Sequence, residues 1–186
     1  MMLANTRQAY GWAAIGLHWI SAGGVLALYL LGEQLEEAVG RAERLAAMQT
    51  HASVGVLLIS FLAARILWSA SQPAPSPLER TAALRLAARL VQGLFLAMIT
   101  VLIISGPIAI WSGGRAIEVF DWFAIPSPFP SRLDWLHEAA EVVHKAASKL
   151  FWPLVALHVA GALKHLIFDR DGTVQRMLWV RRGASS

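Results

Sequence analysis

The sequence contains no cysteine, and only 15% of its 186 residues are charged. The absence of cysteine excludes disulfides, iron–sulfur clusters, thiolate-ligated haem and covalent haem attachment through a CxxCH motif. Soluble domains carry roughly 25% charged residues, so the low charge argues against a soluble fold. The sequence also lacks an internal repeat of ~20–50 residues, which excludes solenoids and propellers. We therefore expect a single domain over residues 1–186.

Hydrophobic residues make up 56% of the chain, and they gather in four long segments. A helix needs about 20 apolar residues to cross a membrane core ~30 Å thick. A signal peptide is the alternative for the first segment, but its apolar part would be only ~7–15 residues long. The sequence thus predicts an all-α integral membrane protein, a bundle of four transmembrane helices. The predicted spans are about 12–31, 51–70, 86–111 and 137–168.

The connections between these spans differ in character. Residues 32–50 are charged and have a helical pattern, whereas residues 112–136 are rich in glycine and proline. The piece FDWFAIPSPFP within the latter indicates an ordered aromatic segment at the membrane interface, where Trp is enriched. In the third span, Gly106-Pro107 is expected to kink or end the helix.

The orientation follows from the distribution of lysine and arginine. Four spans place both termini on the same side, which carries ten Lys and Arg residues against six on the other side. The positive-inside rule then predicts cytoplasmic termini in the inner membrane of a bacterium. The net charge of +4 is explained by these flanking residues. We therefore expect membrane lipid as a partner and no nucleic acid.

Four histidines lie within or at the ends of the apolar spans. His144 and His158 are 14 residues apart, so they share one face of the fourth helix, with roughly 21 Å between them. With the predicted topology, His18 has the depth of His158 in the inner half of the membrane. His51 has the depth of His144 at the outer ends of the helices. Depth alone therefore predicts the pairs His18–His158 and His51–His144.

Each histidine alone has an ordinary interpretation, as a polar group satisfied by a neighbouring helix. Four that pair by depth favour a cofactor instead, because ionisable residues within spans are costly and usually mark function. Zinc prefers four ligands, whereas haem iron takes two axial imidazoles. Two stacked b-type haems therefore fit the pattern. Small residues near these histidines make room for flat macrocycles: Gly16, Gly23, Gly24, Ala52, Ser53, Gly55, Ala160, Gly161 and Ala162.

Three other residues have two interpretations each. Arg65 either extends its side chain to the inner interface or pairs with a propionate of the inner haem. His137 lies seven residues from His144 and is its rival as the outer ligand. His165 lies seven residues from His158, but it is expected to be too close to the inner interface to be a ligand.

Several sequence pieces resemble the bacterial cytochrome b561 family, the four-helix di-haem membrane cytochromes. They include LHW at 17–19, HASVG at 51–55 and the stretch from His144 to Met177 that contains HVAGALKHLIFDRDGTVQRM. The resemblance covers essentially the whole chain. Two departures concern proton or quinone handling. This chain has Gln92 where members often carry a histidine, and His165-Leu166 where members often carry two.

The resemblance implies axial haem ligands at His18, His51, His144 and His158, and electron exchange with a quinone. It also implies the activity best understood in the family, which is oxidation of superoxide at the outer face with ubiquinone as the electron acceptor. Such an oxidoreductase would use a cationic patch to attract superoxide. The candidate residues for that patch are Arg115, Arg132, Lys145 and Lys149.

Two alternatives remain open at this point. The protein is either a stand-alone enzyme or a cytochrome b subunit that links a hydrogenase, a dehydrogenase or a periplasmic redox protein to quinone. The predicted acidic outer side, with three more acidic than basic residues, suits docking of a basic partner. A small proton or metal transporter is a third hypothesis, but the inverted repeats common in transporters are not evident.

Overall fold

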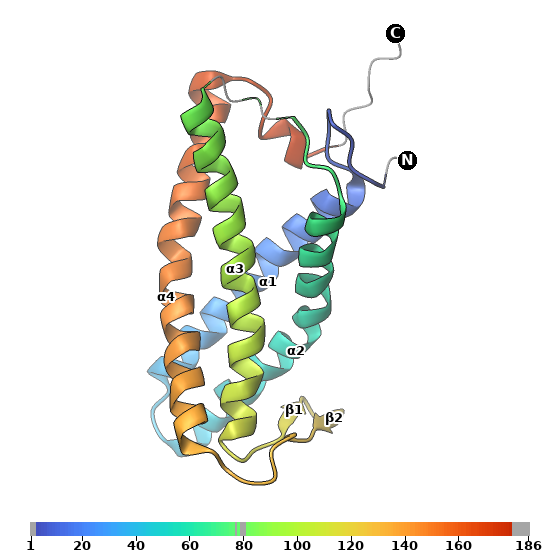
Figure 1. The fold of residues 1–186 in the computed structure, drawn as a ribbon. Coiled ribbons are helices and arrows are strands. Elements are labelled where there is room, and N and C mark those ends of the chain that lie inside the picture. The colour runs from blue at the N-terminus through green and yellow to red at the C-terminus, as the bar shows by residue number, and fades with distance from the viewer. Residues whose placement is uncertain (1–2, 77, 79–80, 180–186) are drawn as a thin grey trace.

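The computed structural model describes residues 3–76, 78 and 81–179. Four long helices form an up-and-down bundle: α1 (Trp12–Glu37), α2 (Arg41–Ser71), α3 (Ala82–Ser112) and α4 (Asp134–Lys164) (Figure 1). All four are long and apolar enough to cross a membrane. The predicted four-helix membrane fold is therefore confirmed. Arg80, Arg181 and Arg182, which contributed to the predicted orientation, lie outside the described residues.

The helices are longer than the predicted spans. Helix α1 ends at Glu37 and α2 begins at Arg41, so only residues 38–40 connect them. The charged stretch 32–50 is thus mostly helix that extends the two spans, as its helical pattern indicated. Helix α3 continues through Pro107 to Ser112, so Gly106-Pro107 does not end it. A proline removes only one backbone hydrogen bond, and the packing of α3 against α4 maintains the helix on both sides of it.

A small β-hairpin lies between α3 and α4, and it was not predicted. Strands β1 (Ile117–Val119) and β2 (Phe123–Ile125) are antiparallel, with Glu118 opposite Ala124. The fully buried Ser53 of α2 holds the hairpin, since its hydroxyl donates to the Glu118 carbonyl (3.1 Å) and accepts from the Phe120 amide (2.8 Å). Residues 112–136 are therefore an ordered cap on this end of the bundle, called the hairpin end below.

The opposite end, called the terminal end, is tied together by the C-terminal segment. A five-residue π-helix (His165–Asp169) follows α4, and the 3₁₀-turn η2 (Gln175–Met177) lies beyond it. The Trp19 indole donates to the Met177 carbonyl (2.7 Å), and the Arg176 guanidinium donates to the Ser76 carbonyl (2.8 Å). The first and last described stretches therefore meet at the same end of the bundle (Figure 1).

The four helices pack as two pairs, α1 with α2 and α3 with α4, and contacts between the pairs are fewer. A core of Leu62, Ile99 and Phe151 joins the pairs at mid-height. Phe151 lies seven residues from both His144 and His158, so this core separates the two ends of the bundle. Most other large apolar side chains are exposed on the outside, as expected for surfaces that face lipid.

Candidate functional site

At the terminal end, His18 of α1 and His158 of α4 face each other between the two helix pairs. Their ring centres are 6.2 Å apart. Two imidazoles that bind one metal ion from opposite sides have ring centres about 6 Å apart, because each metal–nitrogen bond is about 2 Å long and the ring centre lies about 1 Å beyond the nitrogen. The spacing of this pair thus fits one metal ion between the rings.

At the hairpin end, His51 of α2 and His144 of α4 form a second pair with nearly the same spacing. Their ring centres are 6.3 Å apart, and the rings are steeply inclined, at 84°. His137 does not take this position. Its Nδ1 donates to the Ala109 carbonyl (2.7 Å), and its Nε2 lies 4.0 Å from the Glu141 carboxylate. Of the two rivals considered from the sequence, it is His144 that faces His51.

Glycines allow neighbouring helices to approach the hairpin-end rings closely. A Cβ atom at Gly106 would lie 3.1 Å from Cε1 of His144, and one at Gly32 would lie 3.7 Å from Cε1 of His51. Among the small residues expected to make room for a macrocycle, Gly16, Gly23 and Gly161 do face open space. Two others have different roles: Gly24 lies against the Leu58 side chain, and Ser53 holds the hairpin. Helical periodicity predicts neither the Gly24–Leu58 contact nor the Ser53–hairpin contact, because each depends on how another segment packs.

Arg65 lies near the terminal-end pair. It is close enough to His18 and His158 to interact electrostatically with both rings. Its Nε is buried and has no hydrogen-bond partner among the described residues, and the same holds for the indole Nε1 of Trp68. Residues three apart share a helix face, so both donors lie on the same side of α2. Buried donors without a partner are rare, and two together suit an anionic acceptor such as a propionate. Trp68 was not predicted, although its i+3 spacing from Arg65 was a signal.

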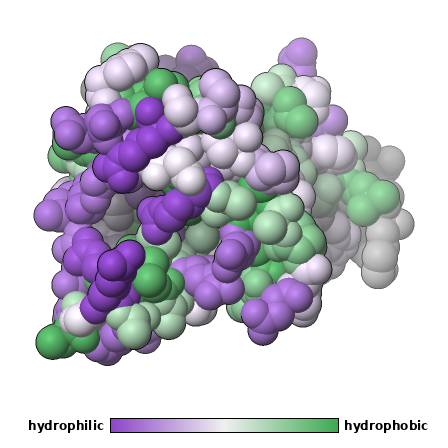
Figure 2. Space-filling model, turned by 90° about the horizontal axis from the view of Figure 1, so that it is seen from below, coloured by the Kyte–Doolittle hydropathy of each residue, from purple (hydrophilic) through white to green (hydrophobic). Residues whose placement is uncertain are grey.

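A cavity of about 990 Å³ opens among the four helices at the hairpin end, and His51 and His144 line it. Its volume lies near the upper limit of ligand pockets, about 1,000 Å³, which suits a large macrocycle. Figure 2 shows this end of the bundle, where hydrophilic side chains gather. Charged residues of both signs line the cavity: Arg41, Arg44, Arg115, Lys145, Lys149, Glu33, Glu36 and Glu141.

The cationic patch predicted from the sequence is only partly brought together. Arg115, Lys145 and Lys149 line the cavity, and Lys145 pairs with Glu141 (2.8 Å). Arg132 pairs with Asp134 instead and is not among the lining residues. Arg41 and Arg44 were missed. Arg44 lies seven residues, or two helical turns, before His51, so periodicity would have placed it on the same face of α2.

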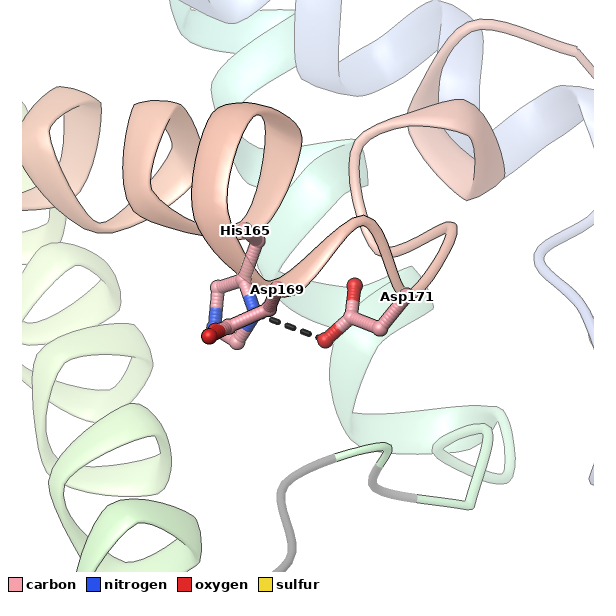
Figure 3. A group of neighbouring side chains, drawn as sticks. All are labelled: His165, Asp169 and Asp171. Atoms are coloured by element: carbon pink, nitrogen blue, oxygen red, sulfur yellow. Dashed lines mark hydrogen bonds and ion pairs between the residues drawn. The ribbon is translucent and has the colours of Figure 1, made fainter.

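A third cluster of ionisable groups lies at the C-terminal end of α4 (Figure 3). The His165 Nδ1 donates to Asp171 (2.7 Å) and lies 3.1 Å from Asp169, which also pairs with Lys164. Burial raises the pKa of Asp171, but hydrogen bonds from Thr173 and His165 outweigh it and hold that pKa below its usual value. All three groups already have partners within the cluster, which closes the helix end.

Comparison with known proteins agrees with this architecture. Residues 9–179 match the family described as prokaryotic cytochrome b561. The chain is also 32% identical over 188 residues to cytochrome b561 homolog 2 of Escherichia coli (strain K12), and the match covers 96% of this chain and 95% of that protein.

Four membrane-crossing helices and this match define the class, a membrane protein that binds b-type haem and transfers electrons. The chain belongs to the prokaryotic cytochrome b561 family. The resemblance noted from the sequence is thereby confirmed, and a bacterial membrane location agrees with it.

Proposed function

We propose that this protein binds two b-type haems, one at each end of the bundle, and transfers electrons across the membrane between them. The observation that carries this proposal is the repeated spacing of 6.2 and 6.3 Å between facing imidazoles. His18 and His158 would hold the haem iron at the terminal end, and His51 and His144 would hold the haem iron at the hairpin end. A bound haem iron supplies one-electron chemistry by cycling between its ferric and ferrous states.

The chain fixes the relation between these two sites through α4, which supplies one ligand to each. Aromatic side chains fill the space between them. The ring of Phe95 lies 5.3 Å from that of Phe151 and 5.3 Å from that of His158. Leu62, Ile99 and Phe151 form the inner wall of the hairpin-end cavity, and this core separates the cavity from the terminal-end pair. Aromatic rings therefore lie on the path between the two proposed haem sites.

At the terminal end, Arg65 and Trp68 are the donors for a haem propionate. This assignment favours the propionate interpretation of Arg65 over a side chain that extends to the interface. It is supported by the buried, unpartnered Nε atom and by the indole one turn further along α2. A guanidinium paired with a carboxylate forms strong charge-assisted hydrogen bonds.

The terminal end faces the cytoplasm in this proposal, and the hairpin end faces the outside of the inner membrane. The excess of lysine and arginine in the sequence on the terminal side supports this orientation.

Superoxide is the electron donor that we propose for the hairpin end, with ubiquinone as the acceptor. Two superoxide anions lose one electron each and leave as dioxygen, and the two electrons with two protons reduce one ubiquinone to ubiquinol. Five basic residues against three glutamates line the hairpin-end cavity, which supports attraction of a small anion despite the acidic outer side of the chain.

A second candidate function is that of a cytochrome b subunit, which receives electrons from a redox protein. The exposed aromatic side chains Trp122 and Phe123 on the hairpin, next to Asp121, favour it because they offer a surface for a partner. Quinone remains the acceptor in this alternative.

The deciding experiment uses the full-length protein purified from membranes without any partner. We expect about two b-type haems per chain, rapid haem reduction by enzymatically generated superoxide, and reoxidation on addition of ubiquinone. Superoxide dismutase added beforehand should abolish the reduction. A protein without a reduced b-type spectrum would overturn both candidates. Reduction only by a co-purifying redox protein would overturn the superoxide proposal and establish the second.

A further inference from the structure

Ser105 of α3 lies directly behind the ring of His144. Its side chain is buried, with the residue only 5% exposed. The hydroxyl oxygen lies 2.7 Å from the Val101 carbonyl oxygen and 3.0 Å from Nδ1 of His144. Both distances are those of good hydrogen bonds. The backbone carbonyl of Leu102 is a second acceptor close to this ring, so Ser105 is the side-chain partner in a contact that the backbone of α3 also makes.

The protons in this chain of hydrogen bonds can be assigned from the donor inventory. A carbonyl oxygen only accepts, so the single hydroxyl hydrogen of Ser105 goes to Val101, one helical turn earlier. The hydroxyl oxygen then presents a lone pair to Nδ1 of His144. That nitrogen must carry the hydrogen and donate it, so the other ring nitrogen, Nε2, keeps its lone pair. A neutral imidazole in this tautomer is prepared to bind a metal ion through Nε2.

We propose that Ser105 is the positioning residue for the axial ligand His144, and that it lowers the reduction potential of the hairpin-end haem. The inference rests on the proposed ligation by His144. A hydrogen bond accepted from the distal N–H of a ligand imidazole fixes the ring orientation and raises the basicity of the ligand. A more basic ligand stabilises ferric over ferrous iron, and second-shell hydrogen bonding is one of the means by which proteins set haem potentials.

The neighbouring Gly106 leaves the space that the His144 ring occupies against α3. A side chain there would press on Cε1 of His144 at 3.1 Å, so glycine lets the ring approach α3 closely enough for the bond to Ser105. The two adjacent residues thus act together: Gly106 provides the space, and Ser105 provides the acceptor.

The other three proposed ligands lack a comparable partner within the described part of the chain. The ring of His51 has a backbone neighbour, the Leu28 carbonyl, but no side-chain acceptor is bonded to it among the described residues. The rings of His18 and His158 contact aromatic neighbours, and no side-chain acceptor is bonded to them among the described residues. Loss of the Ser105 hydroxyl should therefore change only one of the two haem potentials.

The test replaces Ser105 with alanine in the full-length haem protein and measures haem content and both midpoint potentials by optical redox titration. Low-spin haem signals in electron paramagnetic resonance report the ligand orientation. Ser105→Ala should retain both haems, raise one midpoint and leave the other unchanged, and shift the signal of one haem only. Ser105→Thr keeps a hydroxyl at the same position and should restore the wild-type values.

Ser112→Ala is the matched control on the same helix. Ser112 is fully buried, and its hydroxyl also donates to the carbonyl of the residue four positions earlier, Ile108, but among the described residues it makes no hydrogen bond to a histidine ring. This variant should move neither midpoint. If Ser105→Ala leaves both midpoints unchanged, or shifts both equally, the inference is wrong although the two-haem proposal stands. If Ser105→Ala loses one haem, recovery of that haem and its potential in Ser105→Thr supports the inference, and failure to recover overturns it.

Discussion

The two ends of the bundle hold equivalent histidine pairs in different surroundings. At the terminal end, the buried Arg65 lies close to His18 and His158, the Trp68 indole lies one turn further along α2, and the C-terminal segment ties the helices together. At the hairpin end, His51 and His144 line a large cavity with charges of both signs, and a serine supports one ring. The histidine spacing alone therefore does not distinguish the sites. The groups around them do, and they favour a cofactor held by a buried cation at one end and access for a charged reactant at the other.

The largest effect is expected from removing a ligand at one end only. His144→Ala and His51→Ala should each lower the haem content from about two per chain to about one, because each removes one of the two imidazoles proposed to hold a single haem. Pyridine haemochrome analysis measures this directly. His137→Ala on α4 and His165→Ala, directly after α4, are matched controls and should keep both haems. Equal losses in His137→Ala and His144→Ala would mean that the ligand at the hairpin end is wrongly assigned.

A smaller effect should separate the terminal end from the hairpin end through Arg65. Arg65→Leu removes a charge-assisted hydrogen bond worth about 1.5–3 kcal/mol, which corresponds to roughly 10- to 150-fold weaker haem retention at that site. It should also lower the midpoint potential of whatever haem is still bound at the terminal end. A nearby cation favours the ferrous form, so its removal favours the ferric form. Trp68→Phe should change haem retention and midpoint potential in the same direction, but by less. Titration of the haem-free variants with haem measures how tightly each retains it. Unchanged retention in both variants would contradict the propionate assignment.

Steering of superoxide should depend on cations at the hairpin end alone. Lys149→Glu reverses a charge that lines the cavity, whereas Arg132→Glu makes the same change in charge outside it. We expect about tenfold slower haem reduction by superoxide for Lys149→Glu at low ionic strength and a smaller difference at high salt, where charges are screened. Stopped-flow spectroscopy gives both rates. Equal slowing by the two variants would show that only the overall charge matters.

The smallest effect concerns the C-terminal segment at the terminal end. The pKa of Asp171 is below its usual value of 3.8 in the folded protein. Its contribution to stability is therefore fully present above pH 3.8, and it is lost as the pH falls through the lower folded value. The protection of the backbone amides of residues 171–179 against hydrogen exchange, measured relative to the intrinsic rate at each pH, should fall on acidification in that range. Asp171→Asn should show faster exchange already at neutral pH and little further change.

The sequence was informative wherever a single helix carries the information. Helical periodicity placed His144 and His158 on one face, and hydropathy with depth predicted their facing partners His18 and His51. These features need only the rise per residue and the thickness of a membrane. The same periodicity also places Arg44 on the helix face of His51 and Trp68 on the helix face of Arg65.

Features that depend on contacts between helices were not predictable in this way. The bond between Ser105 and His144 joins residues 39 positions apart, and the hairpin is held by Ser53 from 65 positions away. Arg132 lies on the expected side of the bundle, but its pairing with Asp134 keeps it from the cavity. Sequence patterns give the depth of such residues, whereas their partners depend on how the helix pairs pack.

Helix α4 has a further consequence, because it carries one proposed ligand of each pair. The separation of the two metal positions is then set by 14 residues of a single covalent helix, and not by the packing of separate segments. Thermal motion of one helix pair against the other changes the fit around each cofactor but hardly changes this separation. One residue inserted between His144 and His158 would instead rotate one ligand by about 100° relative to the other, so only one pair would keep its alignment. Helix α4 would thus keep the distance between the two proposed haem irons nearly constant, although the groups around them differ between the two ends.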